Sequence, residues 1–325
     1  MQIAILDDYQ DAFRQLDAAK RLAGHQVTVF HDTPPDAAAL AERLEPFDAI
    51  VLLQQRTALS RAVIERLPNL RFISQTGRNL GHLDVAALTE RGIPVSAGGS
   101  GGPHPTAELA WGLILAALRH IPSEVDRLKG GQWQGSVGTG LHGRTLGIYA
   151  FGRIGSLVAA VGRAFGMRVL CWGREGSLAR AREAGYEAAA SREEFFAAAD
   201  VLSLHILSTP ETRGIVTAAD LARMKPDALL VNTSRATIIE PGALVAALQA
   251  GRPGHAAVDV FAQEPVLGAA DPLLHLPNAL CTPHLGYVEW GTLRSLYDAA
   301  VAQLLAYAAG APINVANPAA LPQRG

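Results

Sequence analysis

The segment GRTLGIYAFGRIGSLVA, residues 143–159, decides the fold, because it has the pattern of a strand, a tight glycine turn and the start of a helix. Its central part, Ala150-Phe-Gly152-Arg-Ile-Gly155, follows the G-x-G-x-x-G fingerprint with alanine in place of the first glycine. The second glycine of that fingerprint lets the backbone approach a pyrophosphate, and the third lets the helix pack closely on the sheet. We therefore expect a dinucleotide pyrophosphate at Gly152, Arg153, Ile154 and Gly155. A glycine turn with a purely structural role is the alternative.

Further strand-like runs follow this turn at intervals that helical patterns fill. Together with the run inside the first segment there are six, at residues 145–149, 168–172, 201–205, 229–232, 256–260 and 280–282. Short apolar strands that alternate with helices are typical of a parallel sheet with crossover helices. We expect a doubly wound sheet of six strands, with the helix after the glycine turn beginning near Ile154.

The residues before this series form a second series of the same kind. Its β-branched runs lie at residues 3–6, 27–30, 49–53, 71–74 and 95–96, and they predict another parallel sheet. The breaker-rich stretch GGSGGPHP, residues 98–105, separates the two series and leads into an apolar helix at 106–118. A final helix is expected at 289–307, and the ends of two-domain chains often cross back.

These patterns define the expected architecture. A chain of 325 residues is long enough for two domains of ordinary size. We predict an α/β protein with two Rossmann-like, doubly wound parallel-sheet domains, the first of them discontinuous. The first domain comprises residues 1–97 and 289–325 and binds substrate, and the dinucleotide-binding domain comprises residues 98–288.

Composition narrows the choice of partners. The formal net charge is -2 and the basic residues form no runs, so we expect a small-molecule partner rather than nucleic acid. Cys171 and Cys281 lie far apart and have no zinc-like spacing, which predicts free, buried thiols and no metal site. The start MQIAILDDY is strand-like, and no stretch reaches the length of a membrane span. We therefore expect a cytoplasmic protein with no membrane partner.

The end of the run at 168–172 bears on the type of dinucleotide. In NAD sites an acidic residue about twenty residues past the fingerprint accepts hydrogen bonds from the adenosine ribose and repels a 2′-phosphate. Here the run ends in Gly173, followed by Arg174 and Glu175. A guanidinium beside a strand tip without a carboxylate favours NADP over NAD. Two alternatives remain: Glu175 turns inward and takes the acidic role, or Arg174 is a solvated loop charge.

Three polar motifs follow three of the later strand-like runs. They read VNTSRATIIEPGAL at 231–244, AAVDVFAQEP at 256–265 and CTPHLG at 281–286. Since the carboxyl ends of parallel strands face one ligand crevice, Arg235, Glu264 and His284 can meet there from distant positions. Taken singly, each also suits a structural role, as a surface ion pair, a turn carboxylate or a buried histidine.

With these motifs the chain resembles the D-isomer-specific 2-hydroxyacid dehydrogenases, from LDDY at 6–9 to INVANP at 313–318. The resemblance implies that Arg235 holds the substrate carboxylate and carbonyl oxygen, as a planar guanidinium suits bidentate recognition. It implies that His284 is the general acid in reduction and the base in oxidation, because imidazole titrates near neutrality. Glu264 would accept a hydrogen bond from the other ring nitrogen and orient the ring.

The same resemblance assigns further residues to the cofactor. Asp259 matches the family's aspartate near the nicotinamide carboxamide, and Thr233 with Ser234 match contacts to the cofactor. The segment SLHILSTPET at 203–212 matches the part of the family along the adenosine half, with Leu207 in place of the usual proline. A packed strand-end histidine is the alternative for His205. The full set of cofactor contacts that we expect beyond the glycine turn is Thr106, Gly173, Arg174, His205, Thr212, Thr233, Ser234, Asp259 and Gly286.

The loop QTGRNLGHLD at 75–84 departs from the family, where glycine, valine and aspartate are common and the backbone amides bind the substrate carboxylate. We expect Asn79, Leu80 and Gly81 to contact the substrate. Arg56-Thr57 matches the family's Arg-Ser/Thr pair after the third strand and is expected beside the substrate, with surface solvation as the alternative. Which 2-oxo acid is used depends on the volume of the pocket, and the sequence leaves it open.

The resemblance implies an oxidoreductase that moves a hydride between a nicotinamide cofactor and a 2-oxo acid/D-2-hydroxy acid pair. A relative that acts on formate or phosphite is disfavoured, since family members that oxidise formate have glutamine where Glu264 stands. A non-catalytic nicotinamide-sensing regulator of the same fold is the other alternative. The apolar helix at 106–118 resembles the one through which family members dimerise, so we expect a homodimer through the cofactor domains, with burial inside one chain as the alternative.

Overall fold

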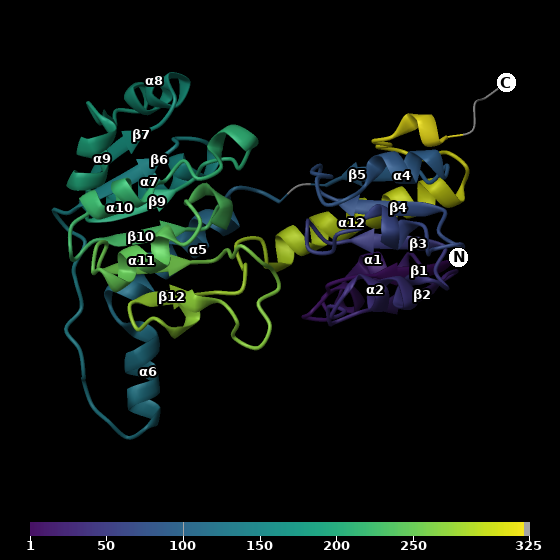
Figure 1. Cartoon of the computed structure of the whole chain (residues 1–325), viewed down its shortest axis with the longest axis horizontal. Coiled ribbons are helices and arrows are strands. Elements are labelled where there is room, and N and C mark those ends of the chain that lie inside the picture. Colours follow the sequence, from purple (N-terminus) through teal and green to yellow (C-terminus); the bar gives the residue numbers. More distant parts are fainter. Residues whose placement is uncertain (100, 322–325) are drawn as a thin grey trace. The chain divides into compact units, whose positions relative to one another are not determined.

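The computed structural model describes residues 1–99 and 101–321, which form two compact units (Figure 1). The first unit is discontinuous, as predicted, and consists of residues 1–102 and 289–325, while the second consists of residues 103–288. The strand that begins at Val95 continues through Gly98 and pairs there with Thr76, so Gly98 belongs to the first unit.

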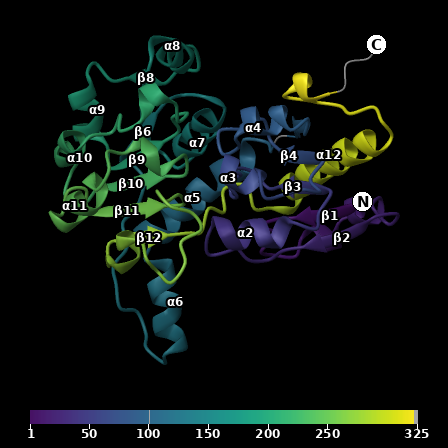
Figure 2. The same cartoon turned by 45° about the vertical axis from the view of Figure 1, so that its right-hand side comes forward.

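The first unit is built on a five-stranded sheet in which all neighbouring strands are parallel. In spatial order its strands are β2 (Gln26–Val29), β1 (Gln2–Ile5), β3 (Ala49–Leu52), β4 (Phe72–Thr76) and β5 (Val95–Gly98). Its helices are α1 (Asp17–Lys20), α2 (Ala37–Leu44), α3 (Arg61–Ile64), α4 (Val85–Glu90) and α12 (Trp290–Ala308). Since successive side chains of a strand point to opposite faces, Ile73 packs with α2, α3 and α4, whereas Ser74 donates a hydrogen bond of 3.0 Å to Ala300 of α12. The C-terminal helix thus covers one face of the N-terminal sheet (Figure 2).

The second unit is built on a seven-stranded parallel sheet. In spatial order its strands are β12 (Ala279–Cys281), β11 (His255–Val258), β10 (Leu229–Asn232), β9 (Val201–Leu204), β6 (Thr145–Tyr149), β7 (Arg168–Trp172) and β8 (Glu187–Ala188). The predicted count of six strands was wrong, because β8 is a two-residue edge strand that pairs with Leu170 and Cys171 and is too short to show a periodicity. With β8 included, the strands β8, β7, β6, β9, β10 and β11 have the doubly wound order 3-2-1-4-5-6, and β12 extends the sheet by one strand.

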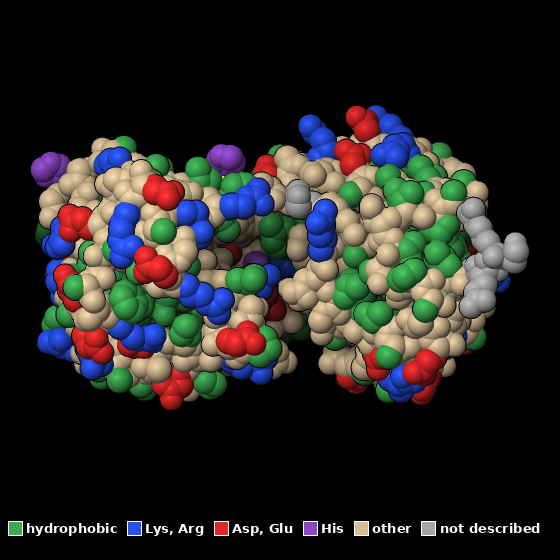
Figure 3. All heavy atoms as spheres, turned by 90° about the horizontal axis from the view of Figure 1, so that it is seen from above, with side chains coloured by type: hydrophobic (Ala, Val, Ile, Leu, Met, Phe, Trp, Pro, Cys, Tyr) green, Lys and Arg blue, Asp and Glu red, His purple; other side chains and the backbone are tan. Residues whose placement is uncertain are grey.

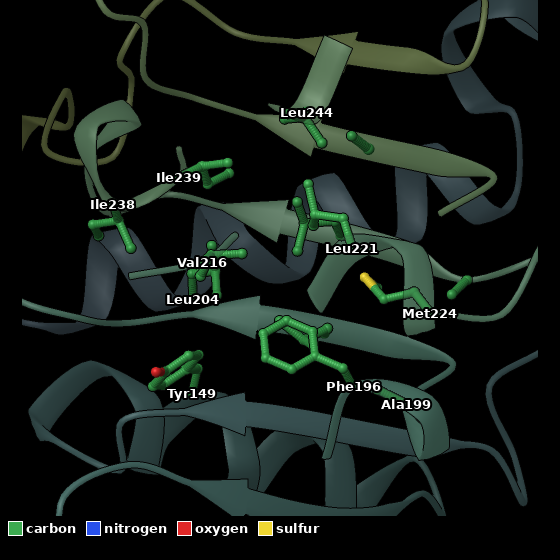
Figure 4. Close-up of a cluster of buried hydrophobic side chains, with 14 of the residues drawn as sticks. Tyr149, Phe196, Ala199, Leu204, Val216, Leu221, Met224, Ile238, Ile239 and Leu244 are labelled. Atoms are coloured by element: carbon green, nitrogen blue, oxygen red, sulfur yellow. The ribbon is translucent and has the colours of Figure 1, made fainter. Parts of the chain in front are cut away.

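Two apolar layers hold this sheet between its helices. One face packs α9 (Arg192–Ala198), α10 (Ala218–Arg223) and α11 (Ala243–Gln249) around Phe196, Leu221 and Leu244 (Figure 4). The other face packs α5 (His104–Leu118) and α7 (Arg153–Ala164). Further helices of the unit are α6 (Ile121–Lys129) and α8 (Glu175–Glu183). Because both faces are covered, the carboxyl edge of the sheet is where polar residues can gather.

Short 3-10 turns complete the secondary structure, at Phe13–Gln15, Pro210–Thr212, Ala236–Ile238, Pro272–His275 and Pro318–Ala320. On the face drawn in Figure 3, acidic and basic side chains are interspersed over the second unit, on the left, whereas on the first unit they gather toward the upper and lower margins. Among residues 1–99 and 101–321, no helix has both the length and the apolar character that crossing a bilayer requires.

Candidate active site

The glycine turn lies where the order of the second sheet reverses. β6 is followed in the chain by β7 on one side and later by β9 on the other, and ligands of open α/β sheets bind at such a switch point. Ala150 takes the left-handed backbone conformation with φ of 75°, which glycine adopts more readily. A Cβ on Gly155 would lie 2.5 Å from the carbonyl oxygen of Ala150. Only glycine therefore allows α7 to pack this closely on the end of β6.

The turn gives a dinucleotide a place to bind. The first hydrogen bond of the helix runs from the amide of Ser156 to the carbonyl of Gly152 at 2.9 Å. The preceding amides, at Arg153, Ile154 and Gly155, have no acceptor within the helix and therefore suit an anion. A Cβ on Gly152 would meet no described atom within 4 Å. The side-chain atoms Nδ1 of His205 and Oγ1 of Thr233 are buried without a hydrogen-bond partner among the described residues. Both features fit a polar ligand at this edge.

The tip of β7 has a distinct arrangement of charges. Gly173 follows the strand with φ of 154°, and a Cβ there would lie 3.3 Å from Oγ of Ser177. Glu175 forms an ion pair of 2.7 Å with Arg182 on the exposed side of α8, so it does not take the acidic position at the strand tip. A hydrogen bond from Thr209 and, to a smaller extent, the charge of Arg174 lower the pKa of Glu211. The charge of Arg174 is therefore close enough to act on a carboxyl group of the turn that follows β9.

Arg235 lies on a turn that Asn232 organises. Asn232 ends β10 and is buried, and its side chain donates to the carbonyl of Arg235 at 3.0 Å while it accepts from the amide of Ser234 at 3.0 Å. The hydroxyl of Ser234 donates to the carbonyl of Leu204 at the end of β9. These bonds fix the backbone that carries the guanidinium. Asn232 was missed at the sequence level, although it stands inside the motif that contains Arg235.

Asp259 follows β11 and binds the loop after β12. Its carboxylate accepts hydrogen bonds from Oγ1 of Thr282 at 2.6 Å, from the amide of Leu285 at 2.7 Å and from the amide of Gly286 at 2.9 Å. Burial raises the pKa of Asp259, and these three bonds act in the opposite direction. The hydroxyl of Thr106 donates to the carbonyl of Gly286. Asp259 and Thr106 thereby hold the loop that carries His284.

His284 and Glu264 form a direct pair. Nδ1 of His284 and Oε2 of Glu264 lie 2.5 Å apart, and the other carboxylate oxygen accepts from the amide of Phe261 at 2.9 Å. His284 has a left-handed φ of 54°, and its amide donates to the carbonyl of Thr282. The imidazole also meets the ring of Tyr287 edge to face at 5.8 Å. The ring is therefore oriented by a carboxylate on one side and an aromatic ring on another.

The remaining expected cofactor contacts have mixed environments. His205 follows β9, its Nε2 lies 3.0 Å from Oγ of Ser203, and burial lowers its pKa to about 4, so the ring is neutral at physiological pH. Thr212 is buried, and its hydroxyl donates to the carbonyl of Leu207 and closes a capping box with Thr209. Thr212 therefore shapes the turn, and its hydroxyl is already engaged.

The expected substrate residues lie in the first unit, at the carboxyl edge of its own sheet. Asn79 and Gly81 are exposed, and the side chain of Asn79 accepts from the amide of Gly81 at 2.9 Å. Leu80 is partly buried against the core beneath α4, which accounts for an apolar residue in this loop. Arg56 follows β3, and its guanidinium lies 5.5 Å from the ring centroid of Tyr9.

Together, the carboxyl edge of the second sheet presents a helix N-terminus whose amides suit an anion, a hydrogen-bonded carboxylate–imidazole pair and a guanidinium. A carboxylate–imidazole pair can move a proton, and a guanidinium can hold a carboxylate. Besides Asn232, the sequence analysis missed Thr282 and Tyr287. Both stand within three residues of His284 in the chain, and that proximity was the available signal.

Comparison with known proteins agrees with this arrangement. A sequence model described as the NAD binding domain of D-isomer specific 2-hydroxyacid dehydrogenases matches residues 111–286. The D-3-phosphoglycerate dehydrogenase of Synechocystis sp. is 37% identical over 273 residues, which cover 83% of this chain and 48% of that protein. The glyoxylate reductase of Aeropyrum pernix is 35% identical over 295 residues, which cover 87% of each chain. The crystal structure of a phosphoglycerate oxidoreductase from Vibrio cholerae has a TM-score of 0.91 at 50% identity, covering 96% of this chain and 100% of that one.

The chain belongs to the D-isomer-specific 2-hydroxyacid dehydrogenase family, as the motifs after the strands of the second unit led us to expect. It spans about half the length of the curated phosphoglycerate dehydrogenases it matches, 48% in the case of the Synechocystis protein. It spans most of the Aeropyrum glyoxylate reductase.

The close approach at Gly155 can be tested by substitution. In Gly155→Ala the new methyl group would clash with the carbonyl of Ala150, and we expect a loss of about 2 kcal/mol in the free energy of unfolding. Urea denaturation measures this loss, and fluorescence titration should show weaker binding of NADPH and NADH. Gly112→Ala in α5 is the control, because its added Cβ meets no described atom within 4 Å and alanine favours a helix. Equal stability of Gly155→Ala and wild type would contradict the packing argument.

Proposed function

We propose that the protein is an oxidoreductase that transfers a hydride between a nicotinamide cofactor and a 2-oxo acid/D-2-hydroxy acid pair. The observation that carries the proposal is the 2.5 Å contact between His284 and Glu264, on the same sheet edge as Arg235. The dehydrogenases and the reductase among the relatives favour this enzyme over a nicotinamide-sensing regulator. Their printed names make 3-phosphoglycerate and glyoxylate the first compounds to assay.

Each residue has a defined task in this reaction. The bound cofactor supplies or accepts the hydride. Nδ1 of His284 is engaged by Glu264, so Nε2 is the atom that transfers the proton to the carbonyl oxygen during reduction and removes it during oxidation. The carboxylate of Glu264 stabilises the protonated imidazole. Arg235 binds the substrate carboxylate with two parallel N–H donors, which fixes the carbonyl carbon in the crevice.

Substitution of the pair tests the proposal. His284→Ala should reduce kcat for an accepted 2-oxo acid by about 100- to 10,000-fold, the usual loss of a general acid. Glu264→Gln should reduce it by about 10- to 100-fold, because a neutral amide holds the imidazole less strongly than the carboxylate does. Absorbance of the reduced nicotinamide measures both effects.

The control for this experiment is His275→Ala, an exposed histidine of the same unit, which should keep near-normal turnover. Near-normal turnover of His284→Ala would refute its role as the acid. Tight cofactor binding by the wild type with no turnover across a panel of 2-oxo acids would instead support the regulator.

We infer that NADP is the preferred cofactor. Gly173 leaves the tip of β7 without a carboxylate, Glu175 is paired with Arg182, and Arg174 stands beside them. A ribose 2′-phosphate would meet a guanidinium there and no acidic side chain at the strand tip.

Arg174→Ala tests this preference. It should raise KM for NADPH by about 10- to 100-fold, since a hydrogen bond to a charged group contributes about 1.5–3 kcal/mol. KM for NADH should change by less than about threefold. Arg168→Ala, which removes an exposed arginine at the opposite end of β7, is the control and should leave KM for NADPH unchanged. A parallel rise of both KM values in Arg174→Ala would argue against phosphate recognition.

We infer that the protein is a homodimer, and that the contact includes α6. The expected helix α5 buries Trp111, Leu113 and Ile114 in its own unit, so much of its apolar surface is already covered. In contrast, α6 buries none of its side chains and exposes an apolar stripe of Ile121, Val125 and Leu128, and Trp133 follows it exposed. Figure 1 shows α6 and the segment after it extending from the second unit. Such a stripe is typical of an interface.

Leu128→Asp should convert the dimer to a monomer, which light scattering after size exclusion measures. A buried charge without a partner is strongly destabilising at an interface. The matched control is Leu267→Asp, because Leu267 is 60% exposed and Leu128 is 59% exposed. An unchanged dimer in Leu128→Asp would exclude α6 from the contact. Cys171 is buried as predicted, whereas Cys281 is only partly buried, and both thiols are free. Free thiols are in keeping with the cytoplasmic location that we also propose.

A further inference from the structure

The first unit has a switch point of its own, between β1 and β3. The chain passes from β1 to β2 on one side and then to β3 on the other, and an open α/β sheet offers a ligand crevice at the carboxyl ends of such a strand pair. Asp7 follows β1 there, and Arg56 with Thr57 follow β3. The polar residues at this point form a connected group.

Asp7 is the buried centre of that group. Asp7 is only 2% exposed. Its carboxylate accepts hydrogen bonds from Oγ1 of Thr57 at 2.6 Å and from Oγ1 of Thr33 at 3.3 Å. The backbone has a left-handed φ of 61°. Burial raises the pKa of Asp7, while Thr57 and then Arg56 lower it. A buried carboxyl group usually adds no more to the free energy of unfolding than an apolar side chain of the same size. Stability alone therefore does not account for an aspartate at this position.

Tyr9 links this centre to Arg56. Its hydroxyl is hydrogen-bonded to Oγ1 of Thr33, which also donates to Asp7. The face of its ring lies 5.5 Å from the guanidinium of Arg56, within the range of a cation–π contact. Arg56 is thus approached from two directions, by the ring of Tyr9 and, through its neighbour Thr57, by Asp7.

We propose that Asp7 and Tyr9 are positioning residues that hold the Arg56 guanidinium at the β1–β3 switch point, where it binds an anionic group of the substrate. The proposal rests on the proposed function, since it assigns a task within substrate binding. Asp7, on the loop after β1, accepts hydrogen bonds from Thr33 on the loop after β2 and from Thr57 on the loop after β3. The ring of Tyr9 restricts the long arginine side chain. Both reduce the conformational freedom that Arg56 would otherwise lose on binding.

A double-mutant cycle between Tyr9 and Arg56 tests this inference. The four proteins are wild type, Tyr9→Leu, Arg56→Ala and the double variant. For each we would measure kcat and KM for an accepted 2-oxo acid, and the Kd of oxalate, a 2-oxo acid mimic that is not reduced, by calorimetry in the presence of NADPH. Tyr9→Leu should raise KM and Kd by about 3- to 20-fold, as expected for a cation–π contact. It should change kcat by less than about threefold. The double variant should have the same KM and the same Kd for oxalate as Arg56→Ala alone.

Asp7→Asn has a matched control in its neighbour Asp8. Asp8 is also buried, but its carboxylate accepts from the backbone amides of Ala12 and Phe13. Asp8→Asn should lower Tm and leave KM unchanged, whereas Asp7→Asn should raise KM with little loss of Tm. If Asp7→Asn does not fold, the partly exposed Tyr9 still carries the test.

The outcomes separate this inference from the proposed function. Equal fold-changes for Tyr9→Leu in the wild-type and Arg56→Ala backgrounds would overturn the inference while turnover persists. A fall in Tm without a change in KM or Kd would do the same. Oxalate binding that weakens as expected in a protein without turnover would support the inference and refute the enzyme. A wild type that neither turns over nor binds oxalate would overturn both.

Discussion

The parallel alignment of strands is the constraint on which the candidate site depends. Each strand of the second sheet runs in the same direction, so residues that follow β6, β9, β10, β11 and β12 all emerge at one edge. Gly155 places a helix N-terminus at this edge, because the absence of a side chain allows α7 to begin close to the end of β6. The helix terminus then lies at the same edge of the sheet as Arg235 and His284. Residues more than a hundred positions apart meet without any long loop to bring them together.

The two sheets share a way of joining neighbouring strand ends. In the second unit Asp259 follows β11 and accepts a hydrogen bond of 2.6 Å from Thr282, which follows the adjacent strand β12. In the first unit Asp7 follows β1 and accepts a hydrogen bond of 2.6 Å from Thr57, which follows the adjacent β3. Burial raises the pKa of both carboxyl groups. Each buried acid lies beside a cationic residue or an imidazole, at the place where a ligand crevice is expected.

Much of the fold could be predicted from the sequence, because buried parallel strands are apolar runs separated by helical patterns. The discontinuous first unit and both sheets follow from such runs, whereas the two-residue β8 has no pattern to detect. Family motifs brought Arg235, Glu264 and His284 to attention. Asp7 and Tyr9 could not be found in the same way, since their contacts to Thr57 and Arg56 depend on which strands are neighbours in space. Asn232 binds Ser234 and Arg235 within its own turn, so its signal lay in the motif itself. The two threonine hydroxyls that bind Asp7 come from two other loops, and only that of Thr33 also contacts Tyr9.

The helix α6 has few contacts within its own chain that could stabilise it. A helix of nine residues is marginal on its own in water, and this one buries no side chain in its own chain. Its tie to the returning segment is local, since Glu124 accepts hydrogen bonds from Ser136 and the amide of Gly135. If a second subunit covers the apolar stripe, part of the helix stability obeys mass action. Amide hydrogens of α6 would then exchange faster on dilution, while those of the sheets would not.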